Sequence, residues 1–425
     1  MPDSTGPLRH GDSHGDSIES RRSWIAASLA LALLAVCYGA PLPVVIGLKP
    51  IQETLGSDRS VVALAGALIW VGTGLGGIGM GWLADRIGIR ATIAFGGVMS
   101  ACGLALSSTG SVWALYVGHG LLIGLLGNAA FYAPLLIYVS RWFDRRRGTA
   151  LALISSGQYI AGMVWPSVFE RGIEHFGWQM TMRGFAVVTV VLILPIALFG
   201  LSPAPEPVAT PLPQGRRTET TQVLDLPPNV VQVVLCLAGF LCCVPMALPA
   251  SHLVAFCSDL GIPATQGAAM LSVMLACAFV SRQFWGWFGD RYGGLLAVLA
   301  GSACQATAIA CFLLTQSEAG LFAVVAAYGL GFSGIIPSYV LAVRDLFPSS
   351  QAAWRVPTLL FTAMCGMAFG SWLGGALYDH FGYYAPAFGA GVVFNLGNLV
   401  VVGLLVWRQR RGQRWKLPEV SLREA

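Results

Sequence analysis

The sequence predicts an all-α integral membrane protein with twelve transmembrane helices in two duplicated halves. Three observations support this fold class. Only 11% of the 425 residues are charged and 56% are hydrophobic, against about 25% and 45–50% in soluble proteins. Long apolar runs follow one another, and the mean hydropathy is +0.69. One motif occurs twice at a fixed spacing. Such a chain cannot cover itself with a water-compatible surface, so lipid is its main solvent.

The repeated motif is GWLADRIG at 81–88 and GWFGDRYG at 286–293, the second copy lying 205 residues after the first. A second pair shares that spacing, EHFG at 174–177 and DHFG at 379–382. Two independent echoes at one spacing indicate a duplicated membrane protein. Many secondary transporters are built from parallel repeats of this kind.

Twelve apolar runs are each long enough to cross the hydrocarbon, which takes about 20 residues in a helix. The predicted spans are 24–47, 61–83, 91–109, 112–138, 147–170, 180–201, 229–257, 265–289, 294–314, 319–345, 356–378 and 384–407. They divide the chain into a cytoplasmic tail, a six-helix half, a linker, a second six-helix half and a cytoplasmic tail, at 1–22, 23–201, 202–228, 229–407 and 408–425.

The polar segments support this division. The break at 202–228 contains seven prolines and two arginines, a composition typical of a solvated linker. Residues 1–22 are polar and lack the apolar core and cleavage site of a signal peptide, so we expect a retained tail. With the N-terminus inside, 20 of the 25 basic residues fall on the cytoplasmic side and four outside. Because basic loops stay cytoplasmic, we expect both termini inside a bacterial inner (plasma) membrane.

Several function classes are disfavoured. The net charge of +5 comes from basic residues at helix ends, not from an aromatic-interleaved patch that would bind nucleic acid. The ten cysteines are scattered through apolar segments without a CxxC pair, so we expect packing residues and no metal or cofactor. No span face carries clustered acid and histidine residues for catalysis, which disfavours a membrane enzyme. The longest internal polar segment, the linker, is too short for a sensor's output domain.

The first repeated motif resembles the signature of the major facilitator superfamily between helices 2 and 3, and the second resembles its counterpart between helices 8 and 9. The resemblance covers residues 23–408 and implies two six-helix bundles around a central cavity that opens alternately to either side. It implies that Asp85 and Arg86 hold the cytoplasmic side closed in one orientation, without touching substrate. The alternative is topological charge at a tight turn. The conformational motif comprises Gly81, Asp85, Arg86, Gly88, Arg90, Asp290 and Arg291.

One cation lies deep inside a span. Arg282 precedes Asp290 by eight residues, roughly 12 Å along a helix, which places it near the bilayer midplane. A lone arginine there costs about 2.5–3.5 kcal/mol even on lenient scales, so such residues mark pathways. Its planar fork matches a carboxylate, and no acid lies at comparable depth. We therefore predict that Arg282 binds an anionic substrate. The alternative is bonding to backbone carbonyls or stacking on Trp285.

Helix 7 supplies two candidates for proton coupling. His252 and Asp259 are seven residues apart and share a helix face, with Asp259 at the outer mouth. Asp259 could pair with Arg282 in the absence of substrate and take up a proton when substrate binds. His252 changes charge near neutral pH and is also a candidate substrate contact. The alternatives are a solvated loop acid and a neutral, hydrogen-bonded histidine.

Three further polar residues lie at plausible cavity depth. Asn128 and Tyr132 share a face of helix 4, and Tyr339 lies on helix 10. Each could donate a hydrogen bond to a carboxylate. Polar contacts between packed helices are the competing explanation.

Arg282-x-x-x-Gly286, together with YGAP at 38–41 in helix 1, resembles the monocarboxylate transporter branch and its bacterial relatives, including oxalate–formate antiporters. Arg282 matches the helix-8 arginine that binds carboxylate in that branch. Ala278 and Leu42 replace an acid and a lysine of animal members, and 356–378 lacks the lysine of oxalate–formate antiporters. A monoanion is therefore favoured over a dianion.

These observations predict a monomeric secondary active transporter, which moves a small organic monocarboxylate through the bilayer by alternating access, together with a proton. Proton-driven efflux of amphipathic compounds and exchange of carboxylate anions are the alternatives.

Overall fold

The computed structural model describes residues 19–143, 146–203 and 223–414, and these are helical apart from turns and one isolated bridge, Val223 to Leu226. Eleven helices are long and apolar enough to span a membrane. One of them, Thr149–Gly200, has 52 residues, about 78 Å of helix against a hydrocarbon core of about 30 Å. Gly177 (φ 79, ψ 162) interrupts it, so this segment crosses twice and the chain makes twelve crossings.

The N-terminal half contains the first six crossings. Its elements are α1 (Arg21–Cys37), α2 (Leu42–Ile46), α3 (Leu48–Leu55), α4 (Arg59–Ile87), α5 (Ile89–Ser107), α6 (Val112–Tyr116), the π-helix η1 (Val117–Gly127), the 3₁₀ turn η2 (Asn128–Ala130), α7 (Tyr132–Ser140), α8 (Arg147–Ser155), α9 (Gly157–Pro195) and the π-helix η3 (Ile196–Gly200). The C-terminal half comprises α10 (Pro228–Asp259), α11 (Ala264–Tyr292), α12 (Gly294–Leu314), α13 (Glu318–Phe332), α14 (Ile335–Leu346), α15 (Ser349–Phe381) and α16 (Ala385–Arg414).

The duplication is visible in the backbone. α4 and α11 each have 29 residues and begin 205 residues apart. α4 ends at Gly88 (φ 83, ψ 158) and α11 at Gly293 (φ 86, ψ 158), again 205 residues apart. Gly177 and Gly382 have the same relation, with φ of 79° and 78°. Only glycine adopts such dihedrals without strain, so the repeated glycines build the same turns twice.

Two crossings are broken where the sequence predicted continuous helices. The helix predicted at 24–47 stops at Cys37 and resumes at Leu42, since Pro41 cannot donate the hydrogen bond that would continue it. The crossing at 112–140 changes from α to π to 3₁₀ geometry before α7. Non-helical backbone at membrane depth is tolerated where it is buried in protein or lines a cavity, so both breaks mark functional positions.

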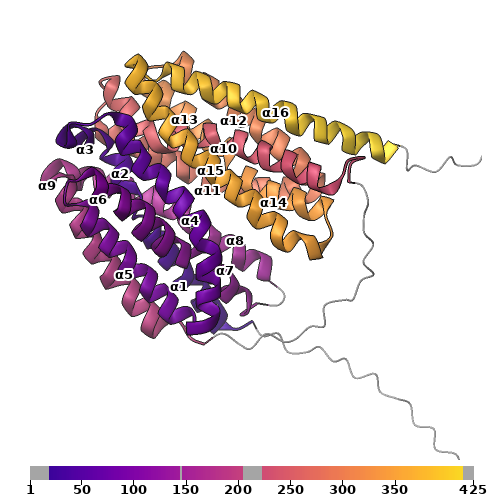
Figure 1. The fold of residues 1–425 in the computed structure, drawn as a ribbon, viewed down its shortest axis with the longest axis horizontal. Coiled ribbons are helices and arrows are strands. Elements are labelled where there is room, and N and C mark those ends of the chain that lie inside the picture. The colour runs from indigo at the N-terminus through magenta and orange to yellow at the C-terminus, as the bar shows by residue number, and fades with distance from the viewer. Residues whose placement is uncertain (1–18, 144–145, 204–222, 415–425) are drawn as a thin grey trace, which may run out of the picture.

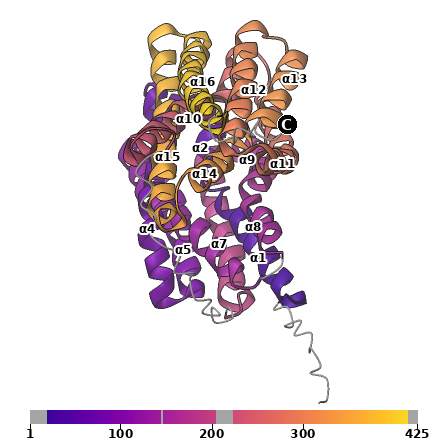
Figure 2. The ribbon, with the colours of Figure 1, turned by 90° about the vertical axis from the view of Figure 1, so that its right-hand side faces the viewer.

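The two halves pack side by side and touch at one end (Figures 1 and 2). They diverge toward the end where α1 begins and α16 ends (Figure 1). Following the orientation that the basic residues predict, we call the closed end outer and the diverging end cytoplasmic. α16 continues to Arg414, beyond the predicted span end at 407. Most of the predicted tails and linker lies outside the described residues.

Candidate functional site

Arg282 contacts a tyrosine of the other half. Its Nη1 donates to the hydroxyl of Tyr159 on α9 at 2.9 Å, and the guanidinium carbon lies 5.3 Å from the centre of that ring. The Tyr159 hydroxyl in turn donates to the backbone oxygen of Ser333 at 3.4 Å. Among the described residues Arg282 forms no ion pair, and the Trp285 indole bonds Leu330 instead.

The two helix breaks bring further tyrosines toward this arginine. Tyr132, the first residue of α7, lies close enough to Arg282 and Tyr159 to interact with both electrostatically. Tyr38, which follows the end of α1, meets the Tyr132 ring edge-on at 6.4 Å between centroids. We call Arg282, Tyr159, Tyr132 and Tyr38 the arginine–tyrosine site. Both halves contribute to it, as expected of the centre of a transporter.

This site has the chemistry to bind a carboxylate. A guanidinium has five N–H donors in a planar fork, and the described hydrogen bonds of Arg282 use one of them. The free donors can hold two carboxylate oxygens at once. The tyrosine rings supply apolar surface with a hydroxyl at the edge, which suits the organic part of such an anion.

Asn128 and Tyr339 lie apart from this site in the structure. The Asn128 side chain is 2% exposed and accepts from the Cys37 thiol at 3.0 Å. Tyr339 is fully buried, and its hydroxyl donates to Asn398 at 2.7 Å. Each contact joins helices of one half, so the structure favours the packing role for both residues.

A cluster of charges from both halves closes the outer end. Arg59 begins α4 with its side chain 3% exposed, and it forms an ion pair with Asp259 at the end of α10. Lys49 on α3 approaches the same carboxylate at 3.1 Å. The Arg59 guanidinium also lies 3.6 Å from the Tyr378 ring centre. Two cations of the N-terminal half therefore share one acid of the C-terminal half.

Asp379 on α15 caps a helix of the opposite half. Its Oδ1 accepts from the backbone N–H of Arg59 and its Oδ2 from that of Ser60, both at 2.8 Å. These are orphan donors at the start of α4, where the Asp58 side chain makes no capping bond. Gly375 allows the approach, because a Cβ there would lie 2.8 Å from the Ser60 Cα.

His252 supports this cluster from inside the C-terminal half. It is 1% exposed, its Nε2 lies 2.7 Å from the Ser371 carbonyl oxygen, and its Nδ1 lies 3.1 Å from the Tyr384 hydroxyl. A carbonyl only accepts, so Nε2 carries the hydrogen. Burial raises the pKa of Tyr384 although Arg59 opposes this effect, so the protonated hydroxyl donates to Nδ1 and His252 is neutral.

The Tyr384 hydroxyl also accepts from Arg59 at 3.2 Å, so the histidine is linked to the ion pairs. We call these residues the outer closure, which consists of Lys49, Arg59, His252, Asp259, Asp379 and Tyr384.

The expected pair between Asp259 and Arg282 does not form. Arg282 lies 18 residues after the first residue of α11, roughly 27 Å from the outer end, whereas Asp259 ends α10 at the outer surface. Asp259 pairs with Arg59 and Lys49 instead. The sequence analysis counted both cations only as outer-side charges. The signal that could have identified Arg59 is the repeat, which places the start of α4 beside the acid of the 379–382 motif.

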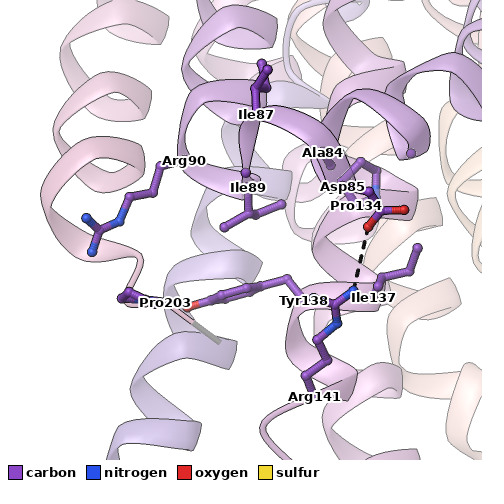
Figure 3. Close-up of a pocket in the computed structure, with 12 residues that line it drawn as sticks. Ala84, Asp85, Ile87, Ile89, Arg90, Pro134, Ile137, Tyr138, Arg141 and Pro203 are labelled. Atoms are coloured by element: carbon purple, nitrogen blue, oxygen red, sulfur yellow. Dashed lines mark ion pairs between the residues drawn. The ribbon is translucent and has the colours of Figure 1, made fainter. Parts of the chain in front are cut away.

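The conformational motif lies at the cytoplasmic end and pairs within its own half. Asp85 Oδ1 lies 3.6 Å from Arg141 Nη2, and Arg86 lies over the Trp82 ring at 4.2 Å. A pocket borders these residues, and Figure 3 shows the Asp85–Arg141 pair beside Arg90, all on the N-terminal half. On the second copy Asp290 is exposed and Arg291 stacks on its neighbour Tyr292. The described pairs of this motif therefore leave the diverging cytoplasmic ends unconnected.

The sequence matches the Major Facilitator Superfamily over residues 23–353 and again over 235–424. The chain belongs to the major facilitator superfamily. It is accordingly a multi-pass membrane transporter and not an enzyme.

Curated relatives and a solved structure agree with this family. The chain is 26% identical to the MFS-type transporter pynF of Aspergillus niger, over 84% of this chain and 80% of that protein. It is 27% identical to monocarboxylate transporter 13 of Bos taurus, over 76% and 75%. A crystal structure of a bacterial homologue of the human lysosomal transporter Spinster matches with a TM-score of 0.66 at 14% identity, over 94% of this chain and 99% of that one. This last likeness concerns the fold.

Proposed function

We propose that this transporter moves a small organic monocarboxylate across the bacterial inner membrane by alternating access, coupled to a proton. The observation that carries the proposal is Arg282, a guanidinium between the two halves whose described contacts include no acid. A buried cation without a counterion is costly, so an anion that supplies the missing charge binds there with a net gain. One chain encloses this site, so a monomer suffices.

The substrate carboxylate accepts from the free donors of Arg282, and Tyr132 and Tyr38 contact its organic part. The Tyr159 hydroxyl joins Arg282 to Ser333 across the two halves, so binding at the guanidinium changes a contact between halves. The outer closure is formed and the cytoplasmic ends diverge, as required of a transporter that exchanges substrate with the cytoplasm. Similarity to monocarboxylate transporter 13 supports the substrate class.

Protons act in this proposal on the outer closure. A proton on Asp259 removes the charge that holds Arg59 and Lys49, which frees the two halves at the outer end. A proton on His252 turns Nδ1 into a donor, which then competes with the Tyr384 hydroxyl for its present arrangement beside Arg59.

Efflux of amphipathic compounds is the second candidate. Trp165, Phe169 and Phe185 form a compact aromatic cluster, with ring centroids 4.7 to 5.6 Å apart. Such rings suit a larger amphipathic substrate. Exchange of two carboxylates through Arg282 needs no proton and remains the third.

Ligand-induced thermal stabilisation of the purified protein tests the substrate class, because a ligand of the folded state raises its apparent stability. Short monocarboxylates, dicarboxylates and amphipathic compounds are compared on wild type, Arg282→Ala, Arg282→Lys and, as a control, Arg410→Ala on the exposed end of α16.

A hydrogen bond to a charged group contributes about 1.5–3 kcal/mol, so we expect Arg282→Ala to weaken monocarboxylate binding about 10- to 150-fold. Arg282→Lys keeps the charge, loses the fork and binds weakly, whereas Arg410→Ala behaves as wild type. Unchanged monocarboxylate binding and uptake by Arg282→Ala would refute the proposal.

A further inference from the structure

Neither proton candidate of the outer closure holds a proton while that closure is formed. Asp259 faces two cations, Arg59 and Lys49, an environment that favours the ionised carboxylate. His252 accepts from Tyr384 at Nδ1 and is neutral. A transporter that carries a proton past a closed outer end therefore needs another group to hold it.

Glu170 on α9 has the properties of such a group. It precedes the Gly177 turn by seven residues, roughly 10 Å below the outer end, within a membrane-spanning segment. The residue is 6% exposed. Its Oε2 is buried and has no hydrogen-bond partner among the described residues. An unpaired acid at such a depth marks a functional site more often than a structural one.

The helix geometry directs Glu170 toward the opposite half. It lies 11 residues after Tyr159, which is three turns of helix and hence the same face. Tyr159 on that face bonds Arg282 of α11. One turn above Tyr159, Gly162 meets α11 so closely that a Cβ there would lie 1.9 Å from a Leu275 side-chain atom. Glu170 therefore faces the outer part of α11, where α9 and α11 run antiparallel.

The internal repeat shows what is unusual about this position. The residue 205 positions after Glu170 is Gly375, where α15 packs tightly on Ser60 of α4. The residue 205 positions after Glu174 is Asp379, which caps α4. In the N-terminal half the packing glycine is replaced by an acid, and Glu174 is exposed without a described hydrogen bond. One arm of the outer end thus closes on a glycine and the other on a titratable carboxyl.

The charges around Glu170 are few. On α9 they are Arg171, Glu174 and His175. α11 presents no ionisable side chain between Ala264 and Met274. From α3, Lys49 approaches this side but is engaged with Asp259. The described part of α5 offers no charged group near its outer end. No cation in direct contact compensates an ionised Glu170.

We propose that Glu170 is a proton-binding site on the transport pathway. When the outer end opens, α9 and α11 separate, water reaches the carboxylate, and an oxygen of Glu170 takes a proton from the outer solution. Closure then places a neutral carboxyl group against α11. The ionised form is disfavoured in that position, so closure favours proton binding and, reciprocally, proton binding favours closure. Asp259 regains its ion pairs as the outer end closes.

Proton coupling is itself a proposal, so the test uses substrate-free protein and does not depend on which substrate is carried. Infrared difference spectra between a high and a low pH report the C=O stretch of any carboxyl group that becomes protonated. Label-to-label distances between Thr109→Cys and Gln316→Cys, in exposed outer loops of the two halves, report opening at the same pH values. Exposed Cys102 and Cys304 are replaced by serine in this background.

We expect wild type to gain a carboxyl band and to shift toward the short outer distance as the pH falls. Glu170→Gln lacks that band and shows the short distance at both pH values. Glu174→Gln, one turn away and exposed, keeps both responses. A wild-type pH response retained in Glu170→Gln, or no carboxyl band in wild type, overturns the proposal. Transport of another substrate class would refute the carboxylate proposal and leave this result intact.

Discussion

Arg282 and Tyr159 are coupled because one hydrogen bond joins the substrate-binding candidate of one half to the other half. The phenol occupies a donor of the guanidinium while the site holds no ligand. An incoming carboxylate competes for the same fork, which has a limited number of donors. Ligand binding and the relative position of the halves therefore depend on the same atoms.

Replacing Tyr159 by phenylalanine tests this coupling. The variant removes the competing hydroxyl and leaves an unsatisfied donor in the empty site, so a carboxylate gains more on binding. A neutral hydrogen bond contributes about 0.5–1.5 kcal/mol, and we expect the monocarboxylate Kd to fall by up to about tenfold in calorimetric titration. Tyr132→Phe, whose hydroxyl has no described bond to Arg282, is the matched control. Weaker binding by Tyr159→Phe would show that the hydroxyl contacts the ligand directly.

At Asp259 a single oxygen pair holds two cations. Asp259→Asn leaves the Arg59 guanidinium, 3% exposed, without its ion pair. Breaking a fully buried pair costs 3–5 kcal/mol, and with the Asp259 side chain 20% exposed we expect about 2 kcal/mol of lost closure. The measured outcome is a longer Thr109–Gln316 label distance at neutral pH.

Asp58→Asn is the control for that measurement, because Asp58 is exposed and one residue from Arg59. An equal lengthening in both variants would contradict the assignment of Asp259 to the outer closure.

At the level of elements, α4 is completed by a residue of another helix. Its first two N–H groups bond Asp379 of α15, and a helix cap contributes about 1 kcal/mol. The carboxylate also interacts favourably with the positive end of the helix dipole. Opening the outer end breaks both interactions at once, so the start of α4 contributes to the stability of the closed state.

We expect Asp379→Ala to lose this contribution, about 1–2 kcal/mol of closure. The internal repeat supplies the control, since Glu174 is the equivalent residue of the other half and is exposed. Glu174→Ala should leave the label distance across the outer end unchanged. Equal effects of the two substitutions would mean that the acids act through general surface charge rather than through the cap.

At the scale of the whole molecule, the sequence was sufficient for the fold. Apolar run length, the break at 202–228 and the repeated glycines depend on hydrophobicity and backbone dihedrals, which are local properties. The twelve crossings and the family were predicted from them. The interruption at Gly177 was foreseeable for the same reason, because its repeat partner Gly382 ends α15.

The contacts between the halves were less predictable, because each depends on which faces meet. Arg59 and Asp259 are 200 residues apart, and nothing in their local sequence links them. Asn128 and Tyr339 show the converse, since suitable depth and residue type did not reveal that packing uses their polar atoms. Glu170 becomes conspicuous only when burial and the repeat are considered together.

The shared helix terminus at Asp379 has one consequence that requires no engineered reporter. The amide hydrogens of Arg59 and Ser60 are held by the opposite half, so they become available to solvent deuterium only during excursions that separate the outer ends. Their exchange rate in unlabelled, unmodified protein is thus a native clock of the transport cycle. Comparing that rate with and without a candidate substrate would show whether the substrate speeds or slows the opening of its own entrance.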